Sequence, residues 1–304
     1  MAHSRFIKDT GLTVRMTLVL FLLGALFVTL VGVLMALFPN YAIVIAVIGI
    51  GIAFYQWWTS DKVAMRAMRA REVSPAEAPE LHAMIDRLCA VADMPKPRVG
   101  IADMAIPNAF ATGRSPDRSV VCVTTGILGM LTAEELEGVL AHELAHVAHR
   151  DVLVMTLAAS AGILAGLLTR GAQYGGLARG RSNNNNGGAA AAFVLTLVVS
   201  LVVYAISFLL IRLLSRYREL SADRAGAYLT MKPGALGSAL QKISGGMAAI
   251  PDRDLRSAQA MNAFFITPAA KGSGMAGLAS THPPLEQRLA QLARIQTELG
   301  RTAG

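Results

Sequence analysis

The sequence predicts an α-helical integral membrane protein that carries a cytoplasmic α+β domain, mainly helical with a small antiparallel sheet. Hydrophobic residues make up 54% of the 304 residues and charged residues only 16%, against about 25% charged in a typical soluble domain. The apolar residues gather into four long uncharged runs, with polar regions between and after them. Only Cys89 and Cys122 are cysteines, so a disulfide-stapled class is excluded, as are disordered and collagen-like chains.

The first two runs, residues 16–38 and 41–58, predict a transmembrane hairpin within an N-terminal region of residues 1–71. The first run has 23 residues without a charge and as a helix would be about 34 Å long, enough to cross the hydrocarbon core. The second ends in Trp57 and Trp58, which is typical of a membrane interface. We expect no cleaved signal peptide, because the first run is long and another span follows at once.

The other two runs, residues 152–169 and 193–211, predict a second hairpin over residues 152–211. Small residues are frequent in the 152–169 run, which fits close helix packing in lipid but also a buried helix of a soluble domain. The connection, residues 170–192, includes an Asn- and Gly-rich flexible stretch. It also carries three arginines and no acidic residue, so a re-entrant second hairpin is an alternative.

The distribution of Lys and Arg predicts the orientation. Basic residues flank both ends of the first hairpin and are absent from its loop; they are Arg5, Lys8, Arg15, Lys62, Arg66, Arg69 and Arg71. Both ends are therefore expected in the cytoplasm. The net charge of +8 then indicates arginines that face an anionic lipid leaflet. We expect the lipid bilayer as a partner and no nucleic acid.

The first polar region, residues 72–151, contains signals for helices and strands. The sequence from Ser74 to Glu77 predicts a helix start, with a Ser cap followed by Pro and Glu. Residues 98–101 and 119–124 read as strands. With the segment between them they predict a small antiparallel sheet of about three strands. A second capping box at residues 132–135 opens a long helix.

That long helix carries a pattern typical of a metal site, His142-Glu143-Leu144-Ala145-His146. Residues four apart on a helix lie about 40° apart around its axis, so His142 and His146 can both reach one metal ion, for which Zn²⁺ is the ordinary choice. Glu143 projects beside the first histidine without ligating. The alternative is two surface histidines on an amphipathic helix, which the apolar flanks of the motif disfavour.

A catalytic zinc site needs a third protein ligand. Glu219 and Asp223 lie four apart after the fourth run; Glu219 can ligate while Asp223 accepts the free N–H of a ligand histidine. The alternative is a solvated face paired with nearby arginines. If both helices continue straight, His146 lies roughly 9 Å before the start of the third run and Glu219 roughly 12 Å after the end of the fourth. These two ends of a hairpin lie on the same side of the membrane, so the two residues would stand at a similar height, which favours the site. The prediction is one Zn²⁺ per chain.

Four segments together resemble a known family: residues 108–113, 142–146, 216–223 and 280–288. They resemble HtpX-type membrane-bound zinc metalloproteases, which are related to the type I CAAX prenyl proteases. The resemblance implies a zincin-like metalloprotease domain in two parts, residues 72–151 and 212–304. It implies His142, His146 and Glu219 as zinc ligands and Glu143 as the catalytic carboxylate.

The resemblance also implies a biological setting. The expected role is protein quality control by endoproteolysis, with misfolded or damaged membrane proteins and unfolded proteins as substrates. The expected location is the cytoplasmic (inner) membrane of a bacterium, as a multi-pass protein with its active site facing the cytoplasm. No oligomeric state is predicted.

Further residues are candidates for substrate handling. The segment before the metal helix could bind substrate as a sheet edge, or could be a simple turn; its candidate residues are Asn108, Ala109, Phe110 and Ala111. His282 could stabilise the oxyanion or cap the last helix, and Arg288 could orient it or a carboxylate of the site.

Three other function classes are weaker. A transporter or zinc-binding scaffold should show ionisable residues within its spans, and these four runs have none. The intact Glu143 disfavours a non-catalytic adaptor. Four spans are few for a prenyl-peptide protease with an enclosed intramembrane chamber.

Overall fold

The computed structural model describes residues 10–37, 39–151, 187–249 and 282–302. The chain forms two compact units. One, the α+β unit, comprises Met1–Leu12, Thr59–Leu153 and Ser215–Gly304; the other, the helical unit, comprises Thr13–Trp58 and Val154–Leu214. The expected span at 152–169 and most of its connection to the fourth run lie outside the described residues.

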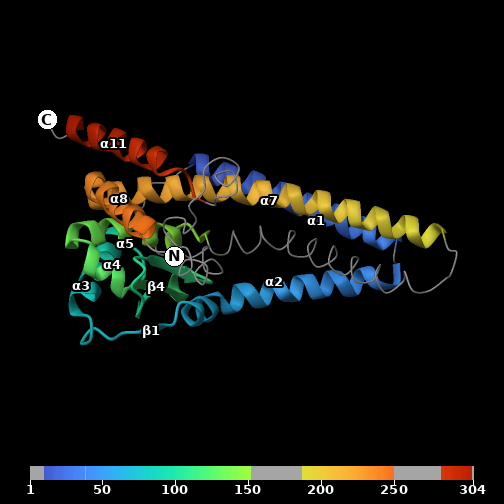
Figure 1. Ribbon diagram of the computed structural model, residues 1–304, viewed down its shortest axis with the longest axis horizontal. Helices are drawn as coiled ribbons and strands as arrows, with labels where there is room; N and C mark the ends of the chain where they lie inside the picture. Colours follow the sequence, from blue (N-terminus) through green and yellow to red (C-terminus); the bar gives the residue numbers. More distant parts are fainter. Residues whose placement is uncertain (1–9, 38, 152–186, 250–281, 303–304) are drawn as a thin grey trace. The chain divides into compact units, whose positions relative to one another are not determined.

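Three long helices contribute to the helical unit: α1 (Thr10–Leu37), α2 (Pro39–Ala67) and α7 (Gly187–Thr230) (Figure 1). Val19 and Leu23 of α1 pack with Leu214 of α7. Stretches of α1 and α7, Thr10–Leu30 and Val194–Thr230, are long and apolar enough to cross a membrane. Their outward apolar side chains are well exposed, as a helix surface that meets lipid requires.

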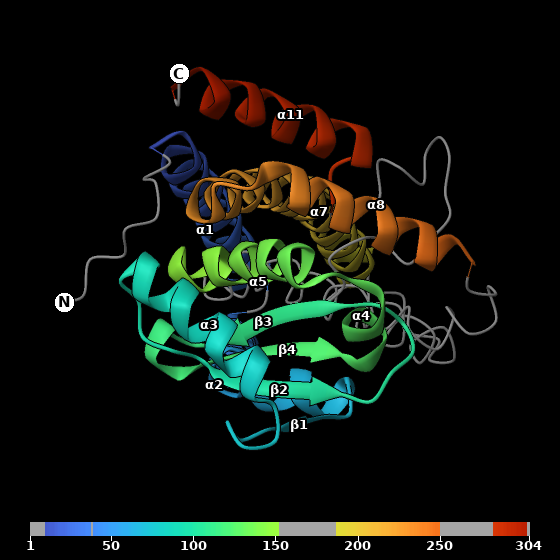
Figure 2. The ribbon, with the colours of Figure 1, turned by 90° about the vertical axis from the view of Figure 1, so that its left-hand side faces the viewer.

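The sheet of the α+β unit has four strands in the order β1-β2-β4-β3 (Figure 2). The strands are β1 (Ala70–Glu72), β2 (Arg98–Ala102), β3 (Ala109–Gly113) and β4 (Ser119–Thr124). β1 pairs antiparallel with β2, and β3 antiparallel with β4. β2 and β4 run parallel, with Arg98 opposite Val120.

The expectation of an antiparallel, roughly three-stranded sheet was therefore wrong, because the sheet is mixed and has four strands. β4 is buried at every position, and its unbroken apolar run is typical of a central strand covered on both faces. It therefore lies between β2 and its hairpin partner β3, and β3 is left at the edge of the sheet.

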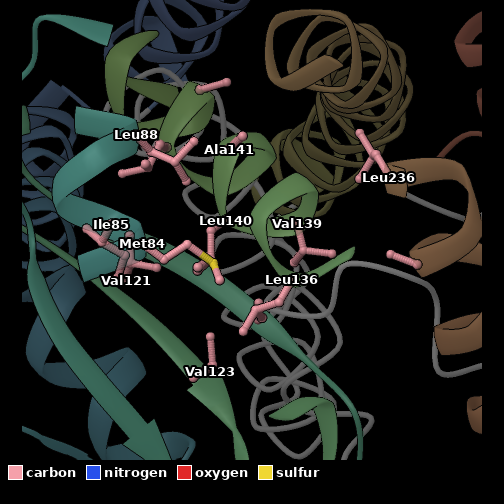
Figure 3. Close-up of a cluster of buried hydrophobic side chains, with 14 of the residues drawn as sticks. Met84, Ile85, Leu88, Val121, Val123, Leu136, Val139, Leu140, Ala141 and Leu236 are labelled. Carbon is pink, nitrogen blue, oxygen red and sulfur yellow. The ribbon is translucent and has the colours of Figure 1, made fainter. Parts of the chain in front are cut away.

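Helices cover the sheet on both faces. On one side, α3 (Pro79–Ala92) and α5 (Ala133–Ala148) pack on the strands. Figure 3 shows the side chains of this core converging from α3, β4 and α5, with Leu88, Val121 and Leu140 among them. On the other side, Phe110 and Cys122 pack against Met68, which follows α2.

The two predicted helix starts have different outcomes. α5 begins at Ala133, and the capping box of Thr132 and Glu135 is present as predicted. α3 begins only at Pro79, so the predicted start at Ser74 was wrong. Glu77 there accepts hydrogen bonds from the backbone N–H and the hydroxyl of Ser74, at 2.7 and 2.9 Å, and this closes a turn ahead of the helix.

Two further helices, α8 (Pro233–Ala249) and α11 (Leu285–Thr302), complete the unit, with α8 beside both α5 and α11. A glycine lets α7 approach α5 very closely. A Cβ atom added to Gly226 would lie 2.9 Å from the backbone nitrogen of His142. The backbones of α7 and α5 are thus nearly in contact at the position of the predicted metal site.

Candidate active site

The α5 helix buries the whole predicted motif. His142, Glu143 and His146 are 1%, 5% and 8% exposed. Leu140 and Leu144 of the same helix are fully buried in the core, so the helix is held from several sides. The alternative of two surface histidines does not describe this chain.

The structure brings His142, His146 and Glu219 together, with one potential ligand atom from each within 4.8 Å of the others. The Nε2 atoms of the two histidines are 3.1 Å apart. They lie 3.6 and 3.5 Å from the carboxylate oxygens of Glu219. A tetrahedral zinc site with bonds of 2.0–2.1 Å separates its ligand atoms by about 3.3 Å. The three residues therefore fit a zinc ion in both donor type and spacing.

A carboxylate lies against the far nitrogen of His142. Its Nδ1 is 2.9 Å from Oδ1 of Asp223. Arg288 of α11 donates to both oxygens of Asp223, from Nε and Nη2, each at 2.7 Å. All three side chains are buried. Asp223 and Arg288 thus lie beside a candidate ligand rather than at the centre of the cluster.

His146 has a similar partner that the sequence analysis missed. Its Nδ1 lies 2.5 Å from Oδ2 of Asp151, and Nε of Arg218 lies 2.9 Å from the same oxygen. Each histidine therefore directs Nδ1 to a carboxylate and Nε2 to the other candidate ligands. A carboxylate on the distal nitrogen is the usual arrangement around metal-bound histidines.

His282 also joins the cluster. Its Nδ1 is 3.0 Å from Oε2 of Glu219, and Nη1 of Arg288 lies 3.9 Å from that oxygen. Its direct neighbour is thus a candidate ligand carboxylate.

The charges around the cluster favour a cation at its centre. Burial opposes charge on His142, but hydrogen bonding to Asp223 and Glu219 raises its pKa to about 10. Burial also opposes charge on Glu219, but the neighbouring histidines hold its pKa well below the usual range. For Glu143 burial dominates and raises the pKa of the carboxyl. Glu219 is therefore available as an anionic ligand, and Glu143 has a stronger affinity for a proton.

The edge strand β3 meets Glu143 through its backbone. The N–H of Ala111 donates to Oε2 of Glu143 at 2.9 Å. Asn108 instead pairs with Thr124 of β4 through its backbone N–H and C=O, each at 2.9 Å. Because backbone groups alternate along an antiparallel strand, Ala109 and Ala111 direct theirs away from β4, while Phe110 directs its own towards β4.

The four candidate substrate residues therefore differ in what they offer. Ala109 and Ala111 turn backbone groups towards the edge of β3 that no described strand covers, as strand addition requires, but the N–H of Ala111 already donates to Glu143. The backbone groups of Asn108 and Phe110 are directed towards β4, within the sheet, and the Phe110 side chain is buried on the face opposite α5. The segment is a strand rather than a simple turn.

Comparisons with known proteins agree on one family. The model of peptidase family M48 matches residues 75–296. The chain is 54% identical to "Protease HtpX homolog 1" of Streptomyces coelicolor, over 98% of this chain and 97% of the relative. It is 50% identical to "Protease HtpX homolog" of Moorella thermoacetica, over 96% of this chain and 97% of the relative.

A solved structure shares the fold. The crystal structure of S. mikatae Ste24p matches with a TM-score of 0.55 at 16% identity. The match covers 88% of this chain and 62% of that one, so the chain spans less than two thirds of that protein's length. At this identity the likeness concerns the fold alone. The family model matches most of the chain, and the relatives align with it almost end to end. The chain therefore belongs to peptidase family M48 and resembles its HtpX proteases.

Proposed function

We propose that this chain is a zinc-dependent endopeptidase of the membrane that cleaves misfolded or damaged membrane proteins at cytoplasmic segments. The observation that carries the proposal is the buried cluster of His142, His146 and Glu219 beside Glu143. Membership of a peptidase family supports peptide-bond hydrolysis as the reaction.

His142, His146 and Glu219 would hold the zinc. Carboxylate oxygens of Asp223 and Asp151 lie 2.9 and 2.5 Å from Nδ1 of the two imidazoles. A proton held on each Nδ1 would leave the Nε2 lone pair for the metal. When bound, zinc polarises the scissile carbonyl and lowers the pKa of water at the site towards about 7.

Glu143 is the proton carrier in this mechanism. The N–H of Ala111 holds its Oε2, which leaves Oε1 for proton transfer. The carboxylate takes a proton from the attacking water and later delivers it to the leaving amine. A substrate strand added to β3 would pair with the outward N–H and C=O of Ala109 and the outward C=O of Ala111, and would thus lie beside Glu143.

The membrane setting belongs to the same proposal. Two apolar helices long enough to span support it, as does the basic flanking of the first hairpin. We place the chain in the bacterial inner membrane with two hairpins, residues 16–58 and 152–211, and with the catalytic centre in the cytoplasm. Substrate cuts should therefore map to cytoplasmic loops and not to the centres of spans.

The test compares wild type with Glu143→Gln in detergent, using a loosely folded membrane protein as substrate. Loss of the general base should lower the rate about 10²–10⁴-fold, while metal analysis still finds one zinc per chain. Glu134→Gln is the matched control, because Glu134 is exposed on the same helix. Activity that survives both Glu143→Gln and zinc chelation would refute the proposal, and zinc binding without cleavage by wild type would favour a scaffold.

A further inference from the structure

Each histidine of the metal cluster is backed by a buried aspartate and an arginine, but the two pairs are built differently. Asp223 is held through both of its oxygens by Arg288. Asp151 is held through Oδ2, which lies 2.5 Å from Nδ1 of His146 and 2.9 Å from Nε of Arg218. The other oxygen of Asp151, Oδ1, is buried and has no hydrogen-bond partner among the described residues. A single oxygen therefore joins the imidazole to the guanidinium.

Burial makes the charge of Arg218 important for the position of Asp151. The side chains of Arg218 and Asp151 are 11% and 1% exposed. A buried carboxylate that has lost the cation beside it is strongly unfavourable, so without Arg218 the Asp151 side chain would turn towards water or draw water in. Either change would take the fixed acceptor away from His146.

The pair also joins the two helices that carry the candidate ligands. Asp151 follows His146 by five residues, just beyond the end of α5, and Arg218 directly precedes Glu219 on α7. All four residues belong to the α+β unit. A movement of Arg218 against Asp151 would thus be passed to one ligand on each helix. The pair therefore helps to set the spacing of His146 and Glu219, which is 3.5 Å between Nε2 and Oε1.

We propose that Arg218 is a positioning residue of the peptidase. By holding Asp151 against His146 it fixes the imidazole for zinc, and so contributes to zinc affinity and to kcat without contacting the substrate. The inference rests on the proposed function and adds a residue to its machinery. It predicts a property that an independent salt bridge lacks, because the effect of Arg218 must disappear once Asp151 no longer transmits it.

A double-mutant cycle measures this dependence. Zinc affinity is determined by competition with a chromogenic chelator for Arg218→Gln, Asp151→Asn and the double variant, each as the full chain in detergent. Each single variant should bind zinc about tenfold more weakly, the usual loss when a partner of a ligand is removed. The double variant should also lose about tenfold, whereas two independent effects would multiply to about a hundredfold.

Charge rescue and steady-state kinetics separate positioning from stability. Arg218→Lys keeps the cation but not the planar guanidinium, and should lose about threefold in zinc affinity. At saturating zinc, Arg218→Gln should lower kcat about tenfold and leave KM within about twofold of wild type, because its effect falls on His146 and not on substrate binding. If Arg218→Gln fails to fold, Arg218→Lys takes its place in the cycle, and its threefold loss should vanish in the Asp151→Asn background.

Arg224→Gln is the matched control, because Arg224 is exposed on the same helix and in the same unit. It should keep both zinc affinity and kcat within about twofold of wild type. A hundredfold loss in the double variant would overturn the positioning role, and so would an Arg218→Gln protein with the zinc affinity of wild type. Wild type that binds zinc but cleaves nothing would count against the proposed function alone, since the cycle requires only zinc binding.

Discussion

Replacement of Gly226 by alanine tests whether the contact between α5 and α7 sets the geometry of the metal cluster. The added Cβ would lie 2.9 Å from the His142 nitrogen and 3.2 Å from the Ala141 carbonyl carbon. Both atoms belong to the backbone, so neither can rotate away. Non-bonded heavy atoms prefer separations of about 3.5–4.0 Å. The helices must therefore separate locally by about half an ångström or more.

That separation acts on the cluster because Glu219, Asp223 and Gly226 follow one another along one face of α7. A metal site tolerates errors of about 0.2 Å in its bond lengths. We expect zinc affinity to fall about 10- to 100-fold, as when a partner of a ligand is lost. Overpacking lowers the free energy of unfolding by about 1–3 kcal/mol, and the better helix propensity of alanine raises it by about 1 kcal/mol. The net loss of stability should thus be about 0–2 kcal/mol.

The assay is competition for zinc between the purified protein and a chromogenic chelator, with thermal unfolding measured alongside. Gly245→Ala on α8 is the matched control, because a Cβ there meets nothing within 4 Å. It should keep the zinc affinity and slightly raise stability. A Gly226→Ala protein that binds zinc within twofold of wild type would refute the reasoning.

Three other variants probe separate parts of the site. Asp151→Asn removes the charge beside His146 and should weaken zinc binding about tenfold; unchanged affinity in the same chelator competition would make Asp151 a purely structural partner. Glu135→Ala removes the capping-box acceptor that also binds Ser238 and Lys242. It should lower the free energy of unfolding, measured in denaturant, by about 1–3 kcal/mol. The control Glu134→Ala loses an exposed ion pair with Lys232 and should lower it by less than about 0.5 kcal/mol. Burial opposes the charge on Glu135, but hydrogen bonds from Lys242, Ser238 and Thr132 lower its pKa to about 2, so its contribution should be complete above about pH 4.5 and lost as the pH falls towards 2. Ala109→Pro removes an outward backbone donor while leaving the pairs with β4 and should raise KM with zinc retained; unchanged kinetics would mean that substrate does not pair there.

Local signals in the sequence were sufficient for the metal helix. The capping box and the spacing of His142 and His146 depend on residues within one helix, and α5 forms as they predict. The strand order of the sheet was harder to predict from the sequence, because it depends on which strand is covered on both faces. The fully buried pattern of β4 contained that information, but assuming that neighbouring strands pair in sequence gave the wrong arrangement.

The partners of the cluster show a similar division. Asp223 was found by its helical spacing from Glu219, which needs only the regularity of α7. Asp151 has no such spacing from His146. It reaches the imidazole because the chain turns sharply after α5, at Arg150 with its φ of 56°. A left-handed arginine cannot be foreseen from residue type, since glycine or asparagine is the usual signal.

The pairing of Arg288 with Asp223 has a consequence for the newly made protein. α11 follows both α5 and α7 in the sequence, and its arginine neutralises a carboxylate that touches a candidate metal ligand. Loss of one member of a buried ion pair typically costs about 3–5 kcal/mol. A nascent chain that has the α5 motif but not yet α11 would hold Asp223 without this cation. The buried charges around the α5 motif would thus be balanced only after α11 has been synthesised.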